Sequence, residues 1–206
     1  MLTYYGSMAQ TRKSTEIRRE EVAQAALRII GERGLTALTT ATLAAEVGLT
    51  TGALFRHFRS FDAILRESVA CALRSVEQSF PGADAPPLER LLEMAARRVR
   101  LLTDEPGIAW MLRSEQALLS LPPEAVAELR QLGKRSRDFL VEAIREGAGQ
   151  GTIRRDIAPE ILVVPVIGTI HTLAGRSGIH GRQKRARDLE VKQVLDALER
   201  MIAPAA

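Results

Sequence analysis

The segment from Thr40 to Phe58, with the sequence TATLAAEVGLTTGALFRHF, constrains the fold of this chain more than any other. Its spacing predicts two short helices joined by a tight turn, the arrangement of a helix-turn-helix. Leu43 and Ala44 share one face of the first helix, and the small alanine leaves room for the second helix to approach. Gly48 supplies the permissive backbone that a sharp turn requires. Thr50 is expected to cap the second helix through its hydroxyl.

The second helix has an apolar underside and an outward face of small and polar residues. Leu54 and Phe58, four residues apart, are expected to anchor it from beneath. A helix whose exposed start carries small and hydroxyl-bearing residues suits the DNA major groove. The residues that we expect at DNA are Thr40, Thr42, Thr50, Thr51, Gly52, Ala53, Phe55, Arg56 and His57, with Arg12 and Lys13 ahead of the first helix. For Arg12 and Lys13, a solvated tail is an equal alternative.

The order of these residues resembles the TetR family of bacterial transcriptional repressors. The matching positions are Thr40, Leu43-Ala44, Gly48, Gly52, Leu54-Phe55, His57-Phe58 and Ser60, preceded by a first helix and its C-cap between Arg19 and Gly34. Two positions depart from the family pattern: Phe55 stands where the family usually carries Tyr, and Phe61 where it usually carries Lys. We therefore expect Arg56 and Arg59 to supply phosphate contacts in their place.

Composition agrees with a helical globular protein that meets DNA. The chain has 206 residues and 46% hydrophobic content, which is ample for a buried core. No apolar run reaches the roughly 18 residues that span a bilayer, and a single cysteine excludes an internal disulfide. The net charge is +4, and residues 1–60 hold eight Lys/Arg against five Asp/Glu, so the basic excess lies with the proposed DNA-reading part. We expect a cytoplasmic protein without a membrane partner.

The rest of the chain keeps helical periodicity, which predicts an all-α fold of about nine helices. We expect a DNA-binding domain over residues 14–62, with its motif at about 39–58, and a larger helical domain over 63–206. Beyond Ser60 the expected helices run from Ser60 toward Pro81, from Leu88 to Leu102, through Trp110 to Leu118, from Pro123 to a glycine-rich stop at 147–151, from Pro159 to Gly175, and from Ala186 to Ile202. The glycines at 147–151 lack the spacing of a dinucleotide-binding loop, and we interpret them as a helix end.

The last two helices are the candidates for dimerisation. Each carries a stripe of small or apolar residues at helical spacing. The predicted interface residues are Gly168, His171, Thr172, Gly175, Val191, Val194, Leu195, Leu198 and Ile202. The resemblance implies that such helices from two subunits form a four-helix bundle. Packing of both stripes on the chain's own core is the alternative.

The resemblance also implies a small-molecule effector in the larger domain. The candidate pocket residues are Cys71, Met94, Arg98, Trp110, Met111, Glu115, Phe139 and His171. Ordinary core packing is the alternative for Trp110, Met111 and Phe139, and a structural ion pair is the alternative for Arg98 with Glu115. The mostly aliphatic interior favours an apolar or amphipathic ligand.

These patterns predict a homodimeric regulator that binds a palindromic double-stranded DNA operator and is released from it by the effector. The chain has three histidines and no sequence motif of a hydrolase, a nucleotide-binding loop or a metal site, so we expect neither catalysis nor a metal or cofactor. Two alternatives remain: a DNA-binding protein without sequence preference, and a helical enzyme with dispersed carboxylates.

Overall fold

The computed structural model describes residues 14–175 and 184–204, and within these ranges the chain is all helical. Arg12 and Lys13 lie outside the described residues. The first unit consists of α1 (Thr15–Arg33), the short 3₁₀ helix η1 (Leu35–Ala37), α2 (Thr40–Glu46) and α3 (Thr51–Leu54). Ser14 caps α1, and Gly34 ends it with a φ of 81°, a conformation that favours glycine.

The remaining helices form the larger part of the molecule. They are α4 (Phe61–Glu77), α5 (Pro87–Asp104), α6 (Pro106–Arg113), α7 (Glu115–Ser120), α8 (Pro123–Gln150), α9 (Pro159–Gly175) and α10 (Lys184–Ile202). The described residues therefore hold ten α-helices, against the nine predicted. The all-α prediction is confirmed.

One helix differs from the sequence-based expectation. The helix expected from Trp110 to Leu118 is divided into α6 and α7, because the backbone at Ser114 is extended. The long helix α8 ends within the predicted glycine cluster at 147–151, where Gly151 caps it in the left-handed conformation. Gly147 lies inside the last turn of α8 and serves close packing: a Cβ there would lie 2.7 Å from the side chain of Ile153.

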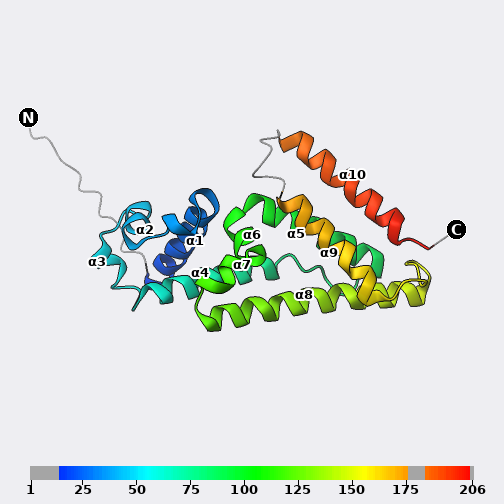
Figure 1. The fold of residues 1–206 in the computed structure, drawn as a ribbon, viewed down its shortest axis with the longest axis horizontal. Helices are drawn as coiled ribbons and strands as arrows, with labels where there is room; N and C mark the ends of the chain where they lie inside the picture. Colours follow the sequence, from blue (N-terminus) through cyan, green and yellow to red (C-terminus); the bar gives the residue numbers. More distant parts are fainter. Residues whose placement is uncertain (1–13, 176–183, 205–206) are drawn as a thin grey trace, which may run out of the picture.

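One continuous apolar core joins the two parts of the molecule. Figure 1 shows α1, α2 and α3 at one end, the helices α5 to α10 at the other, and α4 running between them. Helix α1 packs on both α4 and α6, while α5 packs on α8 and α9. In the part of the chain that the structure describes, no helix is long and apolar enough to cross a membrane.

Candidate DNA-binding surface and effector domain

Reciprocal hydrogen bonds set the start of α2. Thr39 caps the helix by accepting from the backbone N–H of Thr42, and the Thr42 hydroxyl accepts from the backbone N–H of Thr39 in return. The Thr42 hydroxyl also lies 2.7 Å from the carbonyl oxygen of Ala37, to which it can donate. Thr42 thus has a capping role that the sequence analysis did not foresee, and Thr40 is the half-buried threonine beside it.

The turn between α2 and α3 has the predicted construction. Gly48 has a φ of 66°, which a residue with a Cβ rarely adopts. Thr50 caps α3 through its hydroxyl, which accepts from the backbone N–H of Ala53 at 3.1 Å. Leu54 and Phe58 are buried beneath the helix, as predicted. Helix α3 itself spans only Thr51–Leu54, and hydrogen-bonded turns carry the chain on to His57.

The outward face of α3 is free of contacts with the core. Thr51, Gly52 and Arg56 are exposed, and Phe55 is 41% exposed although it is a large apolar residue. A Cβ at Gly52 would meet no atom within 4 Å, so open space lies in front of this position. Of the predicted reading residues, Thr51, Gly52, Phe55 and Arg56 therefore lie together on an exposed surface at α3 and directly after it.

Basic side chains surround this face. Four arginines (Arg19, Arg56, Arg59 and Arg66) and His57 line a hollow of about 580 Å³ next to α3, against two carboxylates, Glu67 and Glu128. His57 is half-buried, and its Nδ1 is buried without a hydrogen-bond partner in the described structure. Such a charge distribution attracts phosphate groups.

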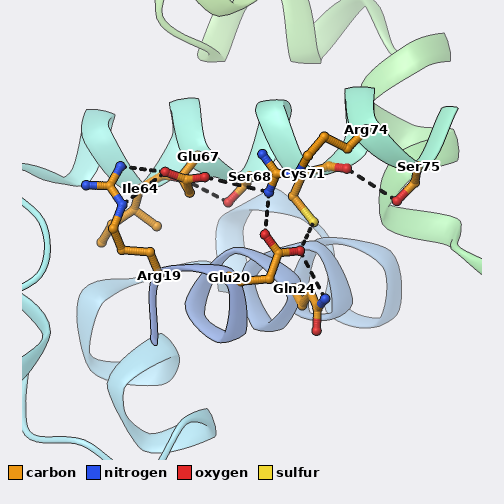
Figure 2. A network of polar contacts seen from close by, with 9 residues as sticks. All are labelled: Arg19, Glu20, Gln24, Ile64, Glu67, Ser68, Cys71, Arg74 and Ser75. Atoms are coloured by element: carbon orange, nitrogen blue, oxygen red, sulfur yellow. Dashed lines mark hydrogen bonds and ion pairs between the residues drawn. The ribbon is translucent and has the colours of Figure 1, made fainter. Parts of the chain in front are cut away.

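A polar network joins α1 to α4 behind the reading helix (Figure 2). The guanidinium of Arg19 donates to the Glu67 carboxylate, with its Nε 3.1 Å from Oε2, and also lies 5.0 Å from the centre of the Phe58 ring. The next residue of α1, Glu20, accepts from Arg74 and from the thiol of Cys71, with a sulfur–oxygen distance of 3.3 Å. The network fixes α1 to α4, and Arg19 also holds the buried Phe58, at the end of the helix-turn-helix, in this arrangement.

This position separates Cys71 from the predicted effector residues. Its thiol faces Glu20 of α1 rather than the interior of the larger domain. Burial, followed by the hydrogen bond and the charge of Glu20, raises the pKa of Cys71 to about 12. The thiol therefore stays protonated at neutral pH, and we remove Cys71 from the candidate pocket.

The other predicted effector residues divide between the core and the surface. Met94, Arg98 and Met111 are buried, Trp110 and Phe139 are half-buried, and Glu115 is exposed on α7. Arg98 forms its hydrogen bonds with Ser79 and Ser136, not with Glu115. Burial, together with the positive charges of Arg113 and Arg98, lowers the pKa of His171. Phe139 lies near Arg98, since both contact the Phe80 ring, whereas the His171 side chain is exposed on α9.

A separate groove of about 1,040 Å³ lies between α5 and α10. Its floor is apolar and includes Leu92 and Leu195, whereas several carboxylates line its walls. The sequence analysis did not find this groove, because its two sides are almost a hundred residues apart in the chain. None of the predicted effector residues lines it.

The predicted dimerisation residues fall into two groups. Gly168, His171 and Thr172 are exposed on α9, which leaves that face available to a partner. Leu198 and Ile202 of α10, in contrast, are buried in the chain's own core, so their assignment to a dimer interface is corrected. The backbone N–H of Arg154 holds this end of α10 in place through the carbonyl oxygen of Ile202 at 2.8 Å.

The remaining predicted positions are intermediate, and two apolar residues were missed. Val191, Val194 and Leu195 pack partly against the core, and Gly175 is half-buried beside the guanidinium of Arg113. Ile161 and Val164 are 63% and 55% exposed on α9. Their spacing from Gly168 and Thr172 follows the helical period and could have revealed them.

Together, the capped helix-turn-helix and the helical domain behind it define a DNA-binding regulator. Residues 23–67 match the sequence profile described as "Bacterial regulatory proteins, tetR family", and residues 84–175 match the profile "Tetracyclin repressor-like, C-terminal domain". The chain belongs to the TetR family of bacterial transcriptional regulators.

Individual relatives agree with this assignment. The chain is 27% identical over 150 residues to the HTH-type transcriptional repressor KstR2 of Mycolicibacterium smegmatis, a match covering 70% of this chain and 72% of the relative. Its fold is similar to the structure of the ketosteroid transcriptional regulator KstR2 of Mycobacterium tuberculosis, with a TM-score of 0.76, 23% identity, and coverage of 94% and 97% of the two chains. It is also similar to AibR solved with isovaleryl coenzyme A and operator DNA, with a TM-score of 0.74, 22% identity, and coverage of 92% and 100%.

Proposed function

We propose that this protein is a homodimeric repressor that binds a palindromic operator through α3 and leaves it when a small molecule binds the larger domain. The observation that carries this proposal is the outward face of α3, where Thr51, Gly52 and Arg56 stand exposed above the buried Leu54 and Phe58. The KstR2 relative is named a repressor, and the AibR structure holds both isovaleryl coenzyme A and operator DNA. Both facts concern those proteins. They support the proposal that here, too, one part of the chain binds DNA and the other binds a small molecule.

The exposed apolar face of α9 supports the dimer. Ile161 and Val164 would be left in water in a single chain, and Gly168 on the same side allows close approach of another helix. A twofold protein matches a palindromic operator, because each subunit then reads one half-site. We propose that the helices α9 of two subunits meet along this face.

The network between α1 and α4 supports control by an effector. Glu67, Cys71 and Arg74 of α4 are tied to α1, so a displacement of α4 would carry the reading motif with it. A ligand that prefers the altered arrangement lowers operator affinity by its differential affinity for the two states. We propose no catalytic activity, and we place the protein in the bacterial cytoplasm, where its DNA target lies.

A substitution at Gly52 tests the placement of the reading helix. Gly52→Glu should weaken binding to operator DNA by about a hundredfold or more, because a carboxylate would face phosphates and base edges. The fold should survive, since a side chain at this position meets open space. Affinity is measured by fluorescence anisotropy on an operator recovered by selection from random double-stranded DNA, and folding by circular dichroism.

The matched control is Gly52→Ala, which adds a Cβ without a charge. It should keep most of the operator affinity. If Gly52→Glu binds the operator as tightly as the unmodified protein, α3 does not enter the groove and the proposal fails.

A further inference from the structure

Helix α5 carries two buried arginines whose surroundings differ. Arg90 and Arg98 are 9% and 7% exposed. Arg90 forms an ion pair with Glu146 of α8. Arg98 has no carboxylate at ion-pair distance among the described residues; its Nε donates to the Ser79 hydroxyl at 2.9 Å, and its terminal nitrogens reach the Ser136 hydroxyl at 3.4 Å.

A buried positive charge with only neutral partners is costly to the fold. Taking a guanidinium out of water is unfavourable unless an opposite charge compensates it. Burial lowers the pKa of Arg98 to about 10, so the group still carries its charge at neutral pH. Glu77 is the acid whose charge acts on Arg98, but its carboxylate is paired with Arg135 at 2.7 Å. Among the described residues, this charge therefore has no carboxylate of its own at ion-pair distance.

The neighbouring charges add to the positive potential. Arg98 and Arg113 both lower the pKa of His171, which places the three side chains within electrostatic range of one another. The acid that acts on Arg98, Glu77, is already paired with Arg135, so the two arginines leave a positive charge here that favours an anion.

Apolar side chains lie around the same guanidinium. The Arg98 guanidinium carbon lies 5.4 Å from the centre of the Phe80 ring, and Phe139 meets Phe80 edge to face at 5.4 Å. Met94, one turn before Arg98 on the same side of α5, is buried. A positive charge and apolar surface therefore lie next to each other at this point of the larger domain.

From this arrangement we infer that Arg98 is the group that recognises the effector, and that the effector is a small amphipathic anion whose carboxylate or phosphate pairs with Arg98. This inference rests on the proposed function, since it assigns chemistry to the effector of that repressor. The groove between α5 and α10 does not suit such a ligand, because Glu89, Asp104 and Asp188 are among the carboxylates that line it.

The first test compares the stability of two matched variants without any ligand. Arg98→Met should raise the Tm by on the order of a few degrees, because it removes an uncompensated buried charge. The hydroxyl of Ser79 keeps a partner in the carbonyl oxygen of Val76, 2.6 Å away. Arg90→Met should lower the Tm instead, because it leaves Glu146 without its ion pair. An Arg98→Met protein that unfolds earlier than the unmodified protein, or fails to fold, would show that Arg98 is structural and would overturn the inference.

The second test uses probes that differ in head group. Butyrate, octanoate and palmitate are compared with the alcohols and amines of the same chain length. Octanoyl coenzyme A is added as a probe that carries phosphate groups. At least one anionic probe should raise the Tm saturably and release operator DNA, whereas the matched alcohols and amines should not. A response to carboxylates alone identifies a carboxylate effector, and a response to the coenzyme A thioester alone identifies a phosphate-bearing one.

The variants connect the probe response to Arg98. Arg98→Met should weaken the effective probe by about tenfold or more, and Arg98→Lys should restore part of the response because it keeps the charge. Equal responses to anions and amines, an undiminished response in Arg98→Met, or no response to any anionic probe would refute the inference. Operator binding by the unmodified protein without a probe is scored separately, so a failure of the proposed function is recognised by itself.

Discussion

Two glycines hold the reading motif against the larger domain. A Cβ at Gly107 would lie 2.0 Å from the carbonyl oxygen of Leu27, and one at Gly31 would lie 2.6 Å from the backbone nitrogen of Gly107. At this point α1 and α6 touch through their main chains. No side chain larger than hydrogen fits at Gly107 without a shift of one helix.

Gly107→Ala should therefore destabilise the protein by about 2–3 kcal/mol, because overpacking forces the two backbones apart. The measurement is the free energy of unfolding in urea. Gly133→Ala is the control on α8: Gly133 is exposed, a Cβ there meets nothing within 4 Å, and the change should stabilise by about 0.5–1 kcal/mol. Equal stability of Gly107→Ala and the unmodified protein would contradict the close crossing of α1 and α6.

Signals confined to a few neighbouring residues were recovered from the sequence. The cap at Thr50, the turn at Gly48 and the buried pair Leu54 and Phe58 all depend on residues within one or two turns. The environment of Cys71 was not recoverable, because its partner Glu20 is 51 residues away and only the packing of α4 on α1 brings them together. The neutral partners of Arg98 are likewise set by the packing of three helices.

Among the helices, α9 and α10 differ in exposure, although both were predicted from the sequence to form the dimer interface. Helix α10 buries Leu198 and Ile202 in the core of its own chain, although Leu189 and Met201 on the same helix stay 57% and 60% exposed. Helix α9 leaves Ile161 and Val164 exposed, and it is the element that we expect to contribute most to the dimer. Truncating α10 would damage the core itself, so a single substitution on α9 is the sharper test.

Val164→Glu should convert the dimer into a folded monomer, because it places a charge in the centre of the proposed helix-helix contact. Molar mass from light scattering after size-exclusion chromatography reports the change. Leu119→Glu is the matched control, since Leu119 is an apolar residue of α7 that is 86% exposed. A dimeric Val164→Glu protein, or a monomeric Leu119→Glu protein, would argue against α9 as the interface.

Helix boundaries were predicted well where local chemistry decides them and poorly where packing does. Ser60 caps α4 through the backbone N–H of Ala63, and Pro159 begins α9, both as expected. The glycine cluster at 147–151 correctly indicated the end of α8, which Gly151 caps, but Gly147 itself lies inside the helix, where it gives room to Ile153. Only the folded arrangement shows that this glycine serves close packing.

At the scale of the whole molecule, the reading motif and the effector domain share one core and are joined through α4. Figure 1 shows α4 running between α3 and the helices of the larger domain, and Figure 2 shows the polar contacts that tie α4 to α1. A repressor needs such a continuous connection, because a ligand can change operator affinity only if it alters the placement of the reading helices.

The central claim is that the protein reads a specific twofold DNA sequence, and selection from random double-stranded DNA tests it most directly. The unmodified protein is incubated with the pool at physiological salt and excess competitor DNA, since weak phosphate contacts are screened under these conditions. We expect enrichment of a palindrome that binds about a thousandfold or more tightly than its scrambled counterpart. A pool that yields no palindrome, with equal affinity for every sequence, would contradict sequence-specific binding and favour a DNA-binding protein without sequence preference.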